Sequence, residues 1–215
     1  MLTAFLRAFR TPDLRKKLLF TVFIIAVFRL GQQLPTPGVS QSAVDSCLAS
    51  SASKTSIFQL LNLFSGGSIS KLTVFALGIM PYITASIILQ LLAVVIPRLE
   101  TLKQEGQAGQ AKITQYTRYL TVGLAVLQST GYIELARSGT LFNGCGTAGN
   151  NPIIPNTGVW SIATMVICMV AGTTVIMWMG ELITDRGVGN GMSVMIFTQV
   201  IAVIPGEMLD RKSVV

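Results

Sequence analysis

Few side chains in this sequence are suited to acid–base, nucleophilic or metal chemistry. The chain has no histidine, the residue that most often serves as a general base or metal ligand. It also has no paired-aspartate site, no serine with a histidine partner and no H-E-x-x-H zinc motif. We therefore expect no catalytic residue, no metal, no cofactor and no enzymatic activity.

Gly187, Gly189 and Gly191 resemble part of a phosphate-binding loop. A P-loop requires a strand before its glycines and a lysine after them, and the sequence offers neither. We interpret these glycines as a tight turn that brings Asn190 to the start of the next apolar stretch.

Charged residues within the apolar stretches would mark a transport site. Arg29, Arg118, Glu134 and Glu181 all lie near the ends of such stretches, where long side chains reach the membrane surface. No carboxylate lies in the middle of a stretch, which argues against an ion-coupled small-molecule transporter because such proteins build their site at the midplane.

The composition predicts a membrane protein. Of the 215 residues, 51% are hydrophobic and only 12% are charged, with a mean hydropathy of +0.63. A membrane span needs about 20 largely apolar residues. We expect an all-α bundle of five transmembrane helices, at residues 18–34, 72–96, 117–136, 158–180 and 192–206, of which the last is short.

Basic residues lie at the ends of the expected spans, which sets the predicted topology. Five precede the first span: Arg7, Arg10, Arg15, Lys16 and Lys17. Four more lie around the loop between the second and third spans: Arg98, Lys103, Lys112 and Arg118. By the positive-inside rule both segments are cytoplasmic, as is the N-terminus. Residues 1–17 fit either a short helix on the membrane surface or a mobile basic flank.

A short apolar segment precedes the second span. It runs from Ile57 to Phe64, contains Asn62 and ends at Ser65, Gly66 and Gly67. Eight apolar residues are too few to cross a bilayer. We interpret residues 57–71 as a re-entrant helix or, alternatively, as a loop helix lying on the membrane surface.

One helical stripe of the second span is apolar at one end and polar at the other. At 100° per residue, Ile79, Ile83, Ser86, Ile87 and Gln90 share this stripe. It suits a water-filled half-channel that ends in an apolar constriction. Ordinary packing of isoleucines, with polar bonds to a neighbouring helix, would give the same pattern.

Two of the three cysteines, Cys47 and Cys145, fall in loops that are expected outside the cytoplasm. They would form a disulfide in an oxidising compartment or remain two free thiols. Cys168 lies within the fourth expected span, where packing is its expected role.

Several long strings resemble the SecY family. They are LNLFSGGSISKLTVFALGIMPYITASIILQLL at 61–92, MWMGELITDRGVGNGMSVMIF at 177–197, FRLGQQLPTPG after the first span and QEGQAGQAKITQYTRYLT before the third. The resemblance implies the channel subunit of the Sec protein translocase, which passes unfolded preproteins across the bacterial inner membrane and releases hydrophobic segments sideways into lipid.

The resemblance also implies roles for individual residues. The pore ring, a collar of aliphatic side chains, maps to Ile79, Ile83, Met192 and Ile196. Met192 stands where the family usually has a branched aliphatic residue, so we expect a softer collar. The plug that closes this ring maps to Ile57, Phe58, Leu61, Asn62, Phe64, Ser65, Gly66 and Gly67.

The lateral gate maps to Ser86, Ile87, Gln90 and Asn190, where Gln90 and Asn190 would hold the closed gate. The loop carrying Arg98, Lys103, Lys112 and Arg118 would face a SecA-type motor ATPase or the ribosome. Other implied partners are SecE- and SecG-type small subunits, signal sequences of preproteins and the lipid bilayer.

The chain departs from the family in its number of spans. Family members have ten spans in two inverted halves, so this chain corresponds to the first half and is expected to need the second. We expect a fragment, a truncated product or half of a split protein. The rival functions are a small-molecule secondary transporter and a non-conducting scaffold.

Overall fold

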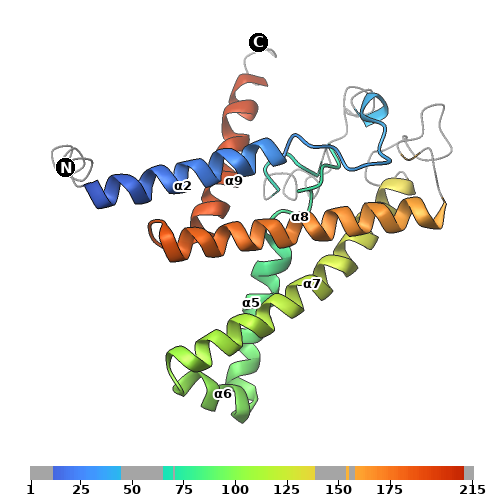
Figure 1. Ribbon diagram of the computed structural model, residues 1–215. Helices are drawn as coiled ribbons and strands as arrows, with labels where there is room; N and C mark the ends of the chain where they lie inside the picture. The colour runs from blue at the N-terminus through green and yellow to red at the C-terminus, as the bar shows by residue number, and fades with distance from the viewer. Residues whose placement is uncertain (1–11, 45–64, 70, 139–153, 155–157, 211–215) are drawn as a thin grey trace.

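A computed structural model of the chain describes residues 12–44, 65–69, 71–138, 154 and 158–210, and these residues form helices joined by turns (Figure 1). The helices are α2 (Pro12–Gly31), α5 (Met80–Val95), α6 (Pro97–Gln104), α7 (Gln107–Arg137), α8 (Val159–Arg186) and α9 (Gly191–Asp210). The described part of the chain contains a single isolated β-bridge, between Pro35 and Thr73. The fold is therefore all-helical, as expected.

Each of the five apolar stretches contains a helix, but most of the helices extend beyond the apolar residues. α7 begins at Gln107 and α8 continues to Arg186, because the polar residues at these ends still favour a helix. α5 is the exception, since it begins only at Met80. The ring of Pro81 obstructs a helix before it, and Gly78 at φ +56° turns the chain there.

Among the described residues, α8 is the only helix that is long and apolar enough by itself to cross a membrane. α5 and α6 meet the same requirement as a pair, although the chain bends by 101° between them. The bend lies at Ile96, whose backbone is extended at φ −99° and ψ 111°. Pro97 causes this, because a residue before proline avoids the helical conformation.

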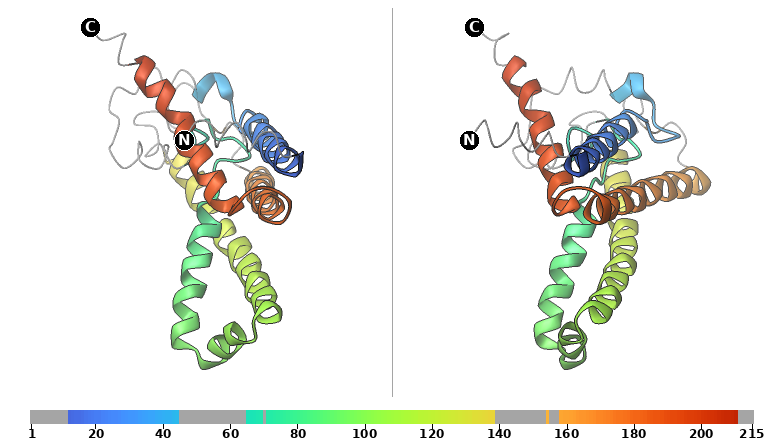
Figure 2. Two further views of the ribbon diagram at one scale, coloured as in Figure 1. Left: turned by 90° about the vertical axis from the view of Figure 1, so that its left-hand side faces the viewer. Right: turned by 60° about the vertical axis from the view of Figure 1, so that its left-hand side comes forward.

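The helices form an open arrangement around one junction. α2 packs against α8, α8 packs against α7 and α9, and α5 packs against α7. α5 and α7 separate as they leave the junction and are joined at their far ends by α6 (Figure 2). Residues 65–69 and 71–79, which we call the turn segment, are non-helical and lie at the junction (Figure 1).

The turn segment is held by Phe75. The Phe75 ring stacks on Phe28 of α2, with the ring centres 5.8 Å apart, and lies directly against Gly31. On its other side, Gly172 of α8 is so close that an added Cβ would contact Val74 and Phe75. The absence of side chains at Gly31 and Gly172 therefore lets α2 and α8 enclose the turn segment.

Backbone hydrogen bonds connect the turn segment to the chain that follows α2. Thr36 N donates to Leu72 O at 3.2 Å, and Val74 N donates to Leu34 O at 3.0 Å. Within the segment, Thr73 N donates to Ser68 O at 3.3 Å. These bonds satisfy polar groups that no helix supplies with partners, a requirement for buried irregular backbone.

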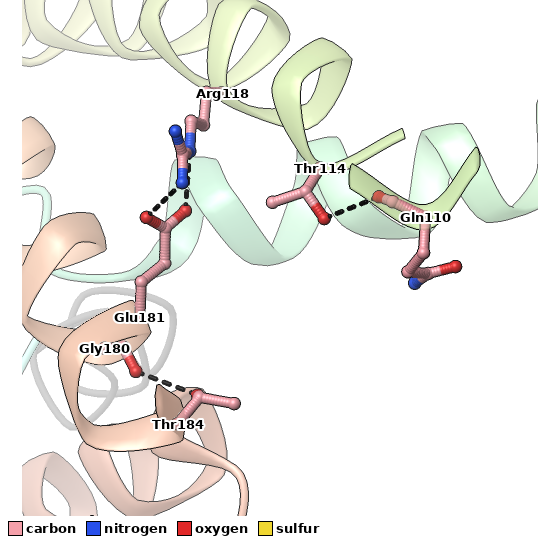
Figure 3. Close-up of polar contacts among 6 residues, drawn as sticks. All are labelled: Gln110, Thr114, Arg118, Gly180, Glu181 and Thr184. Atoms are coloured by element: carbon pink, nitrogen blue, oxygen red, sulfur yellow. Dashed lines mark hydrogen bonds and ion pairs between the residues drawn. The ribbon is translucent and has the colours of Figure 1, made fainter. Parts of the chain in front are cut away.

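An ion pair joins α7 to α8 (Figure 3). The guanidinium of Arg118 donates to both carboxylate oxygens of Glu181, at 2.8 Å from Nε and 2.7 Å from Nη2. Glu181 is 18% exposed and Arg118 is 49% exposed. This two-bond geometry is the strongest form of Arg–carboxylate pairing, so the pair fixes the two helices relative to each other.

We predict that Gly172→Val destabilises the fold. The added side chain meets Val74 O and the Phe75 ring, and overpacking of this kind costs about 2 kcal/mol. Thermal unfolding of the purified chain in detergent measures the loss. Ala171→Val is the control, because Ala171 is exposed on the same helix; equal melting temperatures for the two variants would contradict the packing described here.

A double-mutant cycle tests the ion pair. We expect Arg118→Gln and Glu181→Gln to be coupled by about 1 kcal/mol of unfolding free energy, because the pair is bidentate and partly buried. Arg137 and Glu134 form the control pair, at 3.7 Å and with both side chains more exposed than Glu181. Their coupling should be close to zero, and an equal coupling in both cycles would show that the Arg118 bonds have no special role.

Candidate functional site

The four residues assigned to the pore ring lie in one apolar cluster. Ile79, at the end of the turn segment, is buried at 2% exposure. Ile83 of α5 and Met192 and Ile196 of α9 are partly buried and pack against the same cluster. Residues from α2, α8 and α9 complete it: Ile24, Phe28, Ile176, Met179, Ile183 and Met195. The structure thus brings together two pairs of residues that are more than a hundred positions apart.

Close contact between α8 and α9 positions Met192. An added Cβ at Gly180 would lie 2.5 Å from the Met192 sulfur, so this side chain rests directly on the α8 backbone. Gly191 likewise lies against the carbonyl of Gly180. Two backbones can approach this closely only where both helices carry small residues.

The turn before α9 is fixed by side-chain bonds. Asn190 Oδ1 accepts a bond from Met192 N at 3.1 Å, and Thr184 Oγ1 accepts one from Gly191 N at 2.9 Å. Asn190 therefore acts as the N-cap of α9. This agrees with the glycine-rich stretch being a turn, and Gly189 has a φ of +73°.

The plug assignment is only partly described. Ile57, Phe58, Leu61, Asn62 and Phe64 lie outside the described residues. Ser65, Gly66 and Gly67 lie in turns and not in a helix, and the two glycines have φ values of +67° and +84°. The expectation of a helix continuing through residues 65–69 was therefore wrong, because these left-handed conformations interrupt a helix.

The residues of α5 that were assigned to the lateral gate lie in two environments. Ser86 and Gln90 line a cavity of about 280 Å³ between α5, α6 and α7, with Gln90 Nε2 3.4 Å from Ser86 Oγ. Ile87 is 51% exposed on the helix surface. Tyr82, Lys103, Gln110, Thr114 and Thr117 give the cavity further polar groups. Asn190 bonds within its own turn, so Gln90 and Asn190 each have a partner in their own segment and not in each other.

The stretch expected to be a cytoplasmic loop is mostly helical. Arg98 and Lys103 belong to α6, and Lys112 and Arg118 belong to α7. Only the turn at Glu105 and Gly106 separates these helices, with Gly106 at φ +72°. Lys112 pairs with Glu105 at 3.8 Å and Arg118 pairs with Glu181, so these two residues have contacts within the chain.

A polar network at the junction was not foreseen from the sequence. Arg29 of α2 donates from Nη1 to Gln32 Oε1 and from Nη2 to Thr198 O of α9, both at 2.8 Å. Gln32 in turn donates from Nε2 to Ser65 O at 3.4 Å. The position of Arg29 near a span end was interpreted as snorkelling, but its guanidinium bonds to α9. The one signal in the sequence was that Gln32 follows Arg29 by three positions, a spacing at which two side chains of a helix can bond.

The cysteines and acidic residues add no further site in the described part of the chain. Cys168 is a free, partly buried thiol, whereas Cys47 and Cys145 lie outside the described residues. Within the described ranges, no three histidine, cysteine or acidic side chains gather as metal ligands would.

Comparison with known proteins identifies the family. Residues 73–214 match the SecY family model. The chain is 62% identical to the protein translocase subunit SecY of Streptomyces coelicolor over 97% of its own length and 47% of the relative. Identity to the SecY subunit of Mycobacterium bovis is 53%, over 96% of the chain and 46% of the relative.

The chain spans about half the length of the curated relatives that it matches. The family match covers the end of the turn segment and all helices from α5 to α9, which together carry the four residues of the proposed ring. On this evidence the chain belongs to the SecY family.

Proposed function

We propose that this chain forms the first half of a protein-conducting channel that passes unfolded preproteins across a membrane. The observation that carries the proposal is the gathering of Ile79, Ile83, Met192 and Ile196 in one apolar cluster. A collar of this kind blocks ions by excluding water, yet a flexible chain can slide through it. The portion of the relatives beyond this match would supply the other side of the collar.

The same proposal places the chain in the bacterial inner membrane with a cytoplasmic N-terminus and five crossings. The length and composition of α8, and of α5 with α6, support membrane insertion. The basic residues of α2 at Arg15, Lys16 and Lys17 are exposed and support a cytoplasmic location for that end. On this topology α6 and the first turns of α7 are also cytoplasmic.

Other parts of the structure fit the remaining roles. The cavity lined by Ser86 and Gln90 opens between these helices, which suits a gate that signal sequences contact. Arg98 and Lys103 on α6 offer positive charge to a SecA-type motor ATPase or the ribosome. SecE- and SecG-type subunits would pack on apolar surface, of which Leu19, Phe23 and Trp160 are exposed examples at 60% or more.

The proposed activity needs no catalytic chemistry from this chain. Gating and passage require only that the apolar collar opens and closes, and partners would supply the energy. A secondary transporter is the weaker alternative, because such proteins bind their ion or solute at midplane charges. The Arg29 guanidinium is already bonded to Gln32 and Thr198.

Ion conductance tests the channel. The chain is co-expressed with the remaining half of a close relative and the small subunits, and the complex is placed in planar bilayers. We expect low conductance with the intact chain and a clear increase when residues 57–67 are deleted, because the plug no longer covers the ring. Co-purification of both halves is the control for assembly. Silence of both complexes despite assembly would favour the scaffold function.

Substitution in the ring tests the seal directly. We expect Ile83→Asn to increase the resting ion leak at least severalfold, because a polar side chain keeps water in the constriction. Leu92→Asn is the matched control, since Leu92 lies on the opposite side of α5 at 36% exposure. If the two variants leak equally, Ile83 does not face the conducting path.

A further inference from the structure

The turn segment is held at its first residues by side chains from two distant helices. Gln32 of α2 donates to Ser65 O, and Arg29 holds the other end of that amide through Gln32 Oε1. The same guanidinium bonds to Thr198 O of α9. Because a guanidinium presents several donors in a rigid fork, Arg29 can orient Gln32 and join α2 to α9 at the same time.

Gly66 fits closely into this arrangement. A Cβ added there would lie 2.9 Å from Gln32 Nε2 and 3.5 Å from Gln199 O. Glycine is also favoured by the left-handed φ of +67°. The turn at Ser65 and Gly66 is thus seated between the Gln32 amide and the α9 backbone.

The seated turn segment leaves several buried polar atoms without partners. Within the described residues these atoms are Thr36 Oγ1, Ser68 Oγ, Thr73 Oγ1 and both amide atoms of Gln199. Gln199 is 1% exposed, and its Nε2 lies 3.1 Å from where a Cβ of Gly78 would be. All of these residues belong to the turn segment or pack against it, and each unpaired buried group lowers the stability of this arrangement.

We propose that Arg29 and Gln32 form a latch that keeps residues 65–69, the first part of the turn segment, seated while the channel is at rest, and that the unpaired amide of Gln199 makes this seat easy to leave. The proposal rests on the channel function proposed above, and it identifies residues that would regulate the opening of that channel. Arg29 and Gln32 are positioning residues, since they act through the Ser65 carbonyl and not on the transported chain.

Two opposing contributions to the free energy determine how often the latch opens. The bonds from Arg29 and Gln32 favour the seated position, while the buried unpaired atoms oppose it. When residues 65–69 move away, Gln199 and the hydroxyl of Ser68 gain access to water or to the passing chain. A two-position element needs opposing terms of similar size, because only then do small contacts shift its population.

Gln32→Glu tests the latch with a change of one group. The carboxylate keeps an acceptor for Arg29 but loses the donor to Ser65 O and places a second oxygen against it. In the assembled channel we expect spontaneous openings without substrate to increase about fivefold, the ratio that corresponds to about 1 kcal/mol for one hydrogen bond. Gln104→Glu is the control, because Gln104 is exposed at the end of α6, which joins the far ends of α5 and α7 (Figure 2).

A second variant should act in the opposite direction. Gln199→Leu removes both unpaired amide atoms at similar volume, so the seated position becomes more stable and openings become rarer. Equal behaviour of Gln32→Glu and Gln104→Glu would overturn the latch, because added charge alone would then explain the effect. An increase in openings in Gln199→Leu would overturn the role assigned to that amide.

Thiol labelling gives a readout that does not require conductance. Ser68 is 2% exposed, so a Ser68→Cys side chain, with the native cysteines replaced by serine, reacts with a membrane-impermeant maleimide only when residues 65–69 leave their seat. We expect about fivefold faster labelling with Gln32→Glu and slower labelling with Gln199→Leu. An unchanged rate with Gln32→Glu refutes the latch; altered rates without conductance in any complex leave the latch supported and refute the channel.

Discussion

The fold depends on burying a stretch of non-helical backbone among helices. In a membrane, irregular backbone is tolerated only where protein or a water-filled cavity satisfies its polar groups. The turn segment meets this condition through its bonds to Leu34 and Thr36 and through Phe75, which lies between α2 and α8. Because α5 starts directly after this segment, the position of Ile79 and Ile83 follows from the same contacts.

Glycines of α8 position both sides of the candidate site. Gly172 of α8 receives the turn segment, and Gly180 of the same helix receives Met192 of α9. The two halves of the apolar cluster are therefore positioned against one rigid helix. The Arg118–Glu181 pair adds α7 to the same helix close to Gly180 (Figure 3). α8 thus supports α2, α7, α9 and the turn segment that leads into α5.

Local patterns in the sequence predicted the features that depend on nearby residues. Apolar stretches located the helices, and the stripe through Ile79 and Ile83 grouped two residues that the structure places in one apolar cluster. The late start of α5 was missed because hydropathy does not distinguish buried turns from helix. The role of Arg29 was missed because its partner Thr198 is 169 positions away, and no local pattern in a single sequence encodes such a contact. The four ring residues were grouped through family resemblance and not through periodicity alone.

The geometry of the proposed ring is set mainly by backbone contacts and less by the four side chains assigned to it. Met192 is longer and more flexible than a branched aliphatic residue, yet its position is defined by the missing side chain of Gly180 beneath it. Asn190 and Thr184 fix the first turn of α9 independently of what residue 192 is. A change of side chain at position 192 therefore alters only how easily that side chain deforms, whereas a side chain at position 180 or 191 would move α9 and shift Ile196 with it.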